Sequence, residues 1–250
     1  MNDTKRGFTP ALGFHALTPL YDRVVAMTTR ERTFKQALLD QSAIGAGDEV
    51  LDVGCGTGTL AIEARRRQPG ARVSALDADP AVLAIATSKA RRAGAGMAFD
   101  LGRSSQLPYA DHRFDRVLSS LFLHHLSWGD KLLTAREMHR VLRPGGELHV
   151  ADWGRAGGLA SRTAFLLVQL LDGFDTTSDN VAGMLPVLFG AAGFRHVEEP
   201  RRIPTALGIV SLYRAVKTGV APLSARPWTR RRRANRQESS GRGSPWRDWQ

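Results

Sequence analysis

Residues 50 to 60 read Val50-Leu51-Asp52-Val53-Gly54-Cys55-Gly56-Thr57-Gly58-Thr59-Leu60. An apolar run of strand length breaks into three alternate glycines and then continues as a helical pattern. Glycine has no Cβ, so it permits positive φ and lets a ligand lie directly on the backbone. The following helix offers free N–H groups and a positive dipole end. The segment therefore predicts a strand, a ligand-binding loop and a helix, in that order.

The spacing of the glycines separates this loop from other glycine-rich loops. Dinucleotide-binding enzymes use the spacing G-x-G-x-x-G/A, and here Thr59 occupies the third glycine position. The Gly-Lys-Ser/Thr ending that nucleoside triphosphate sites require is also missing from the sequence of the loop. A phosphate-binding loop is therefore disfavoured.

A second polar position follows the next expected strand. Asp77 comes directly after an apolar run, where a carboxylate can accept two hydrogen bonds from a ribose diol. The alternative role is that of a helix cap, but Asp79 stands immediately before Pro80 and is better placed for it. We therefore expect Asp77 to bind a ribose.

Outward from this loop, short apolar runs alternate with longer helical patterns, which is typical of an α/β fold with a mainly parallel sheet. Helices are expected over 60–68, from 80 to about 94 and over 128–142. The expected strands, seven in all, are 49–53, 72–76, 96–101, 115–120, 147–151, 196–199 and 208–216.

Three segments stand apart from this alternation. We expect residues 1–45 to form an N-terminal helical cap, with a helix over 21–40, on a ligand-binding domain over 46–220. An insertion over 157–193, helical around 165–171 and 180–190, is expected to lie beside the ligand edge as a lid. Residues 221–250 lose hydrophobic periodicity, are rich in Arg, Ser, Pro and Gly, and are predicted to be a disordered basic tail.

Composition sets further bounds. The formal net charge is +11, and the tail contributes much of it with eight arginines against two acidic residues. We expect a solvated tail without a partner, and the alternative is nucleic-acid binding, for which this tail is the only candidate segment. The only cysteine is Cys55, and the longest apolar stretch, 164–171, is much shorter than the roughly 20 residues that cross a bilayer. We expect a cytoplasmic protein without a membrane span.

Several motifs together resemble the class I S-adenosylmethionine-dependent methyltransferases, in particular the group that includes quinone-biosynthesis C-methyltransferases. The resemblance covers about residues 15 to 216. It rests on the glycine loop and Asp77, and on four further stretches, which are Leu107-Pro108-Tyr109, Arg113-Phe114-Asp115-Arg116-Val117-Leu118-Ser119-Ser120, His124-His125-Leu126 and Arg140-Val141-Leu142-Arg143-Pro144-Gly145-Gly146.

The resemblance implies a seven-stranded, doubly wound, Rossmann-like sheet with an antiparallel last strand, and S-adenosylmethionine as cofactor. It places the methionine moiety on the loop formed by Asp52, Val53, Gly54, Cys55, Gly56, Thr57 and Gly58. It also implies Asp77 on the ribose, Ala78 against adenine, and Ser120 and Leu121 facing the reacting methyl group.

One position departs from the family pattern. Many relatives have an Asp four residues before the Leu-Pro pair, and this chain has Arg103 there. Ser104, Ser105 or backbone groups are the expected replacements at adenine, since Asp100 lies three residues too early.

Methyl transfer by in-line displacement needs chiefly alignment in a dry pocket, and a base only if the acceptor arrives protonated. His124 and His125 follow the fourth strand and are the candidate bases, of which at most one is expected to face the pocket. The alternative is that either histidine only packs or caps the loop. No metal is expected, because His124, His125 and Asp130 lack a ligand spacing.

The expected acceptor is a small, moderately apolar molecule, because the segments 165–171 and 184–189 are rich in Leu, Phe and Met. Two alternatives stay open. One is an RNA methyltransferase that uses the basic tail, and the other is a non-catalytic S-adenosylmethionine-binding domain. The sequence does not indicate the oligomeric state or the atom that is methylated.

Overall fold

The computed structural model describes residues 30–158, 163, 165, 169 and 174–219. Three expectations fall partly or wholly outside these residues. They are the predicted tail 221–250, the part of the N-terminal helix before Arg30, and most of the helix expected over 165–171.

The described residues form a seven-stranded sheet with the order β3-β2-β1-β4-β5-β7-β6. The strands are β1 (Glu49–Val53), β2 (Arg72–Asp77), β3 (Ala98–Leu101), β4 (Phe114–Ser120), β5 (Leu142–Trp153), β6 (Arg195–Thr205) and β7 (Gly208–Val216). Strands β1 to β5 run parallel to one another, whereas β7 is antiparallel to both β5 and β6. The predicted α/β sheet with its antiparallel last strand is confirmed. The strand order reverses between β1 and β4, which is where doubly wound sheets bind ligands.

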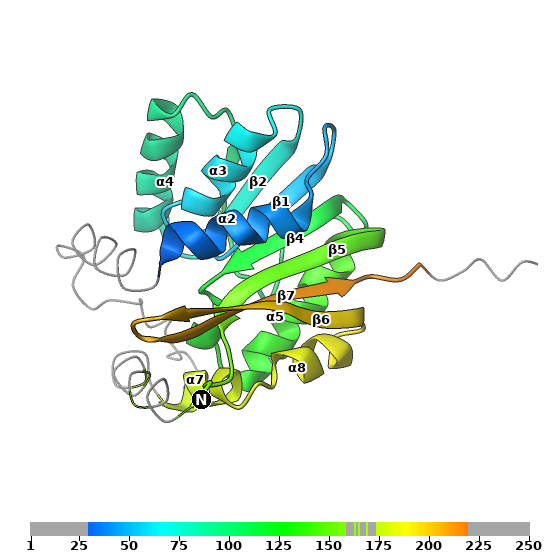
Figure 1. The fold of residues 1–250 in the computed structure, drawn as a ribbon. Coiled ribbons are helices and arrows are strands. Elements are labelled where there is room, and N and C mark those ends of the chain that lie inside the picture. The colour runs from blue at the N-terminus through cyan, green and yellow to red at the C-terminus, as the bar shows by residue number, and fades with distance from the viewer. Residues whose placement is uncertain (1–29, 159–162, 164, 166–168, 170–173, 220–250) are drawn as a thin grey trace, which may run out of the picture. The chain divides into compact units, whose positions relative to one another are not determined.

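Helices cover both faces of this sheet (Figure 1). On one face, α2 (Glu31–Ser42), α3 (Thr59–Arg67) and α4 (Pro80–Arg92) share an apolar core with the strands. On the other face, α5 (Trp128–Val141) and α8 (Leu185–Ala191) pack against a second core. The short 3-10 helix η2 (Leu123–His125) follows β4, and α7 (Phe174–Val181) contacts both η2 and β5.

Alternation along β1 explains how one polar residue enters the core. Val50 belongs to the core beneath α2 and α3, whereas Leu51 and Val53 belong to the core beneath α5. Successive side chains of a strand point to opposite faces, so Asp52 lies on the side of Val50, towards α2 and α3. A buried carboxylate is thereby placed directly before the glycine loop.

The predicted start of α4 is confirmed in detail. Asp79 is its N-cap, and the Asp79 carboxylate accepts a 2.8 Å hydrogen bond from the amide of Ala81. Pro80 occupies the first helical position. Asp77 is therefore not the cap of this helix, as the sequence indicated.

Two strands are longer than predicted because their partners extend them. β6 runs from Arg195 to Thr205, beyond the expected 196–199, since it pairs with β7 along most of its length. β5 begins at Leu142, earlier than the expected residue 147, and its pairing with β4 shifts register between Leu142 and Glu147. Here Lys217 exchanges backbone hydrogen bonds with Gly145 and Gly146.

The helical stretch expected over 180–190 is two helices. It breaks at Gly183, whose φ of +75° is a left-handed conformation, and Pro186 stands in the first turn of α8. Leu185, Leu188 and Phe189 of α8 are completely buried, in the core shared with α5. The second half of the segment expected to form a lid therefore packs on a face of the sheet, while α7 lies beside the end of β5.

Candidate active site

The glycine loop follows the carboxyl end of β1 and turns beside the end of β2. Gly54, Gly56 and Gly58 have φ values of +71°, +52° and +74°. The amides of Gly54 and Cys55 both donate to the carbonyl of Leu76, at 2.9 and 3.0 Å. Three left-handed glycines and this pair of bonds bend the chain across the sheet edge before α3 begins at Thr59.

Two of these glycines serve different purposes. A Cβ on Gly54 would lie 2.2 Å from the ring of Phe122, which follows β4, so this glycine lets the aromatic ring rest on the loop. A Cβ on Gly56 would have nothing within 4 Å. The backbone at Gly56 therefore borders open space where a ligand can approach it.

Asp77 is tied to the loop. Its Oδ2 accepts a 2.8 Å hydrogen bond from the amide of Gly56, and its Oδ1 accepts one of 3.1 Å from the amide of Asp79. Burial raises the pKa of this carboxyl above its usual value, against the lowering effect of these amides. Each carboxylate oxygen has a second lone pair, so Asp77 holds the loop and keeps acceptor capacity for a diol.

Asp52 is a buried carboxylate near the end of β1. Its exposed fraction is 1%, and neither of its carboxylate oxygens has a hydrogen-bond partner among the residues that the structure describes. Burial raises the pKa of this carboxyl to about 7. The ammonium of Lys35 on α2 lowers this pKa, and the negative charge of Asp77 raises it further. An orphaned buried carboxylate beneath an open glycine loop fits a ligand that brings a cationic donor.

The other predicted loop residues are also located. The Cys55 thiol is free and buried, and burial raises its pKa, so it is not a reactive thiolate. The hydroxyl of Thr57 accepts a 3.0 Å hydrogen bond from Lys89 on α4.

The segment after β3 lies beside Asp77, because the amide of Gly102 donates to the Asp77 carbonyl at 3.0 Å. The Ser104 hydroxyl is hydrogen-bonded to Thr134 of α5 at 2.8 Å, whereas Ser105 is half-buried. Ala78 and Arg103 are exposed.

Asp100 has another partner. Its Oδ2 accepts a 2.7 Å hydrogen bond from the hydroxyl of the buried Tyr109. Asp100 is thus engaged in holding Tyr109, in line with the expectation that it does not replace the missing adenine-binding Asp.

The end of β4 turns sharply at the same edge. Ser120 is the last residue of β4, and Leu121 has a φ of +48°, uncommon for a residue with a branched side chain. The Leu121 amide donates to the carbonyl of Ala151 at 2.8 Å. This turn directs Phe122 onto Gly54 and leads into η2.

The structure separates the two candidate histidines. His124 is buried, and its Nδ1 lies 2.7 Å from Oδ1 of Asp152 near the end of β5. His125 is exposed, although the surrounding protein and the neighbouring His124 lower its pKa below the ordinary value. Only His124 is held in a fixed orientation by a carboxylate.

Asp152 is itself held by several donors. Its oxygens accept hydrogen bonds from the backbone amides of Leu123 and Trp153, at 2.8 and 2.7 Å. They also accept one from the side-chain amide of Asn180 on α7, at 3.2 Å. Burial raises the pKa of Asp152, but His124 and these donors lower it, and the net shift is downward. The result is a buried, ionised carboxylate that fixes the His124 ring.

Asp152 and Lys35 are site residues that the sequence did not predict. Asp152 follows the mostly apolar run Leu148-His149-Val150-Ala151, so an acidic residue at the end of an expected strand is the available signal. Lys35 lies on α2, far from the loop in sequence, and has no local motif to mark it.

The motif residues around 107–109 and Arg140 hold the backbone near the site in place. Arg140 donates to the carbonyls of Leu107 and Tyr109 and pairs with Glu137, while Glu137 accepts from the Leu107 amide at 2.8 Å. The segment over 107–109 is thereby fixed to α5. These motif residues position the backbone and do not line the loop.

None of the helices in the described part of the chain has the length and apolar character needed to cross a membrane. The His, Cys, Asp and Glu residues of the same part form no group of three that could hold a metal ion.

Comparisons with known proteins agree with this geometry. Residues 50–146 match the family described as a methyltransferase domain. The demethylmenaquinone methyltransferase of Thermus thermophilus is 30% identical over 217 residues, which are 84% of this chain and 97% of that protein. The methyltransferase GfsG of Streptomyces halstedii is 37% identical over 150 residues, 59% of this chain, and the chain spans only 51% of the length of GfsG.

Among solved structures, a SAM-dependent methyltransferase of Methanosarcina mazei has a similar fold. Its TM-score is 0.58 at 21% identity, and the match covers 72% of this chain and 97% of the other. Together with the sequence relatives, these findings show that the chain belongs to the class I S-adenosylmethionine-dependent methyltransferase family.

Proposed function

We propose that this chain transfers the methyl group of S-adenosylmethionine to a small, moderately apolar acceptor. The observation that carries the proposal is the open glycine loop, which is tied to Asp77 and lies next to the orphaned carboxylate of Asp52. The bound cofactor supplies a methyl group on a sulfonium.

The roles of the cofactor-binding residues follow from their positions. Asp52 receives the ammonium of the methionine moiety, which lies on the backbone of the loop from Gly54 to Gly58. Asp77 accepts hydrogen bonds from the ribose, and Ala78 lies against adenine beside Ser104 and Ser105. Ser120 and Leu121 face the reacting methyl group from the end of β4. Support for these roles comes from the shared sheet edge and the open space at Gly56.

We propose that His124, and not His125, is the base that removes a proton from the acceptor. Asp152 holds Nδ1 of His124, so Nε2 is the ring nitrogen that takes a proton from a hydroxyl or acidic carbon of the acceptor. Asp152 acts through His124 as a positioning residue. The side chain of His125 is exposed, so its ring is not fixed in the way that Asp152 fixes the ring of His124.

The surroundings of His124 favour an apolar acceptor. The ring of Trp153 lies 6.3 Å from that of His124, and Phe165 stacks edge-on against Trp153 at 5.2 Å. The names of the relatives point the same way, because the Thermus protein is named for demethylmenaquinone, a quinone. We propose an aromatic, quinoid or polyketide-like compound. A cytoplasmic location accompanies this proposal and is supported by the single, unpaired cysteine.

The test is an acceptor screen with S-adenosylmethionine, read by mass spectrometry for methylated product. We expect product with aromatic or quinoid hydroxyl-bearing compounds and none with RNA. Methylation of RNA or of charged macromolecules alone would refute the proposed acceptor class. Cofactor binding without product from any acceptor would favour a binding domain.

A further inference from the structure

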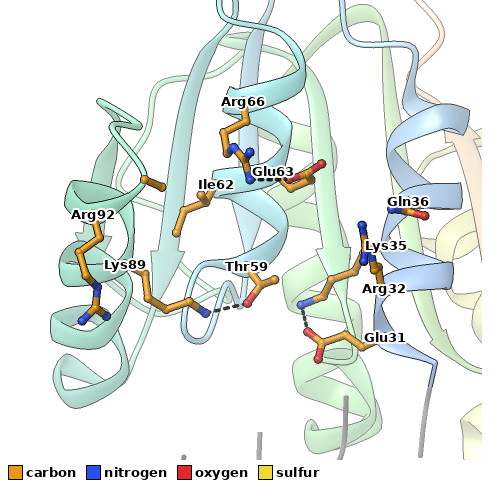
Figure 2. Close-up of a pocket in the computed structure, with 11 residues that line it drawn as sticks. Glu31, Arg32, Lys35, Gln36, Thr59, Ile62, Glu63, Arg66, Lys89 and Arg92 are labelled. Carbon is orange, nitrogen blue, oxygen red and sulfur yellow. Dashed lines mark hydrogen bonds and ion pairs between the residues drawn. The ribbon is translucent and has the colours of Figure 1, made fainter. Parts of the chain in front are cut away.

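A cavity of about 790 Å³ lies on the face of the sheet covered by α2, α3 and α4. We call it the basic groove, since its described lining holds five cationic and two anionic side chains. Figure 2 shows α3 in the middle, with α4 on one side and α2 on the other. The lining residues are Glu31, Arg32, Lys35, Gln36, Thr59, Ile62, Glu63, Arg66, Lys89, Arg92 and Ala93.

The basic groove is separate from the proposed cofactor edge. Its described lining includes none of the loop residues from Gly54 to Gly58, and neither Asp77 nor Ser120. It approaches that edge at Thr59, where α3 begins, at Lys35, whose charge acts on Asp52, and through the hydrogen bond from Lys89 to Thr57.

Both carboxylates of the groove already have cationic partners. Glu31 pairs with Lys35, and Glu63 lies 3.6 Å from Arg66 and 3.2 Å from Arg67. Arg32 and Arg92 make no ion pair within the described ranges, so their charges are not neutralised there. The groove therefore carries an excess of positive charge from three separate helices.

Lys89 is held in place at the groove. Its Nζ donates to the hydroxyls of Thr57 and Thr59, at 3.0 and 2.8 Å, and Figure 2 shows the bond to Thr59. These two hydrogen bonds fix the position of the Lys89 ammonium at the groove.

We propose that the basic groove binds a compact oligophosphate, meaning a small molecule with two or more linked phosphate groups. A cavity of roughly 300–1,000 Å³ is the size that holds a small-molecule ligand. Guanidinium groups bind phosphate oxygens in a bidentate manner, and Arg32 and Arg92 supply two from opposite walls. The cations come from three helices, and this distribution favours a ligand with more than one phosphate group. Ile62 and Ala93 add an apolar part to the lining.

The test is calorimetric titration of the full chain with inorganic tripolyphosphate at low salt, in the presence of saturating S-adenosylhomocysteine. We expect one molecule to bind per chain. Arg92→Gln should weaken the dissociation constant about tenfold, the loss of one charge-assisted hydrogen bond. The matched control is Arg91→Gln, which removes the same charge from the exposed neighbour on α4 and should change affinity less than about twofold.

A second variant tests the sign of the effect. Glu63→Gln removes a negative charge and releases Arg66, so tripolyphosphate should bind more tightly. Citrate serves as a carboxylate probe of similar charge.

Several outcomes would overturn the proposal. They are no binding, equal weakening by Arg91→Gln and Arg92→Gln, tighter binding of citrate than of tripolyphosphate, and loss of binding when S-adenosylhomocysteine is present. None of these results bears on methyl transfer, because the probe requires neither cofactor turnover nor acceptor.

Discussion

At the scale of single residues, the loop shows how two glycines with similar φ angles constrain the chain for different reasons. Gly54 makes room for the ring of Phe122, whereas Gly56 leaves its surroundings open. The first glycine therefore concerns packing, and the second concerns access to the backbone.

Alanine substitutions should separate these two reasons. Gly56→Ala should cost about 1–2 kcal/mol of stability, the strain of a left-handed residue with a Cβ. Gly54→Ala should cost about 2–5 kcal/mol, since overpacking against Phe122 adds to that strain. Chemical denaturation measures both. Calorimetry should show that Gly56→Ala also weakens S-adenosylhomocysteine binding, by more than the small loss of stability would cause. An unchanged affinity would contradict the proposal that the ligand approaches the open side of Gly56.

The carboxyl of Asp52 should make cofactor binding depend on pH. Its pKa of about 7 in the free protein means that it is largely protonated below neutral pH. An ammonium favours the ionised form, so affinity should rise with pH up to about 7 and fall up to about tenfold per unit below it.

The measurement is the dissociation constant of S-adenosylhomocysteine between about pH 5.5 and 8. Asp52→Asn should bind more weakly and flatten this dependence, which separates Asp52 from Asp77, whose pKa is also raised. An affinity that rises as the pH falls would show that Asp52 does not face the ammonium.

Replacing Asp152 should affect turnover and not cofactor binding. Asp152→Asn keeps the shape of the side chain but removes the charge that fixes the His124 ring. We expect kcat to fall by about 100-fold or more, within the usual contribution of general base catalysis. The S-adenosylhomocysteine dissociation constant should stay within about twofold, and the pH profile of kcat should change. A parallel loss of cofactor affinity would indicate a purely structural role.

At the scale of elements, α7 is attached to the sheet edge by buried polar contacts. Lys131 of α5 is completely buried, and its ammonium donates to the carbonyl of Thr176 at 2.6 Å and to Asp179 at 3.2 Å. Asn180 also donates to the carbonyl of Trp153 at 3.2 Å. Polar contacts of this kind hold α7 beside His124 and Asp152.

Lys131→Met should loosen α7 selectively. The side chain keeps much of its length but loses both hydrogen bonds, so amide exchange of residues 174–181 should accelerate while that of β1 and β4 stays slow. Global stability should fall by about 1–3 kcal/mol. Arg136→Met, an exposed position on the same helix, is the control. Equal acceleration in both variants would contradict the attachment.

The element scale also shows what sequence patterns can and cannot determine. Local signals located α4 well, because Asp79 and Pro80 act within one turn. The ends of β6 depend on pairing with β7, a contact between segments, and were underestimated for that reason. The apolar face of α8 is visible in the sequence, whereas its packing partner α5 is not, because that contact joins two segments that are far apart in the chain.

At the scale of the whole molecule, the strand order brings the ends of β1, β2 and β4 to one edge. The mainly parallel, doubly wound sheet with its antiparallel last strand follows from the alternating pattern and from the resemblance to the family. The choice between His124 and His125 could not follow from sequence, since it depends on which ring meets Asp152 across two strands. The same holds for the basic groove, whose cations come from three helices.

The most direct test of the cofactor assignment is calorimetry with S-adenosylmethionine, S-adenosylhomocysteine and NAD in parallel, on the unmodified chain and on Asp77→Ala. We expect both sulfur nucleosides to bind, NAD to give no binding heat, and Asp77→Ala to weaken binding by about tenfold or more. Binding of NAD in preference to the sulfur nucleosides, or full affinity in Asp77→Ala, would contradict the assignment.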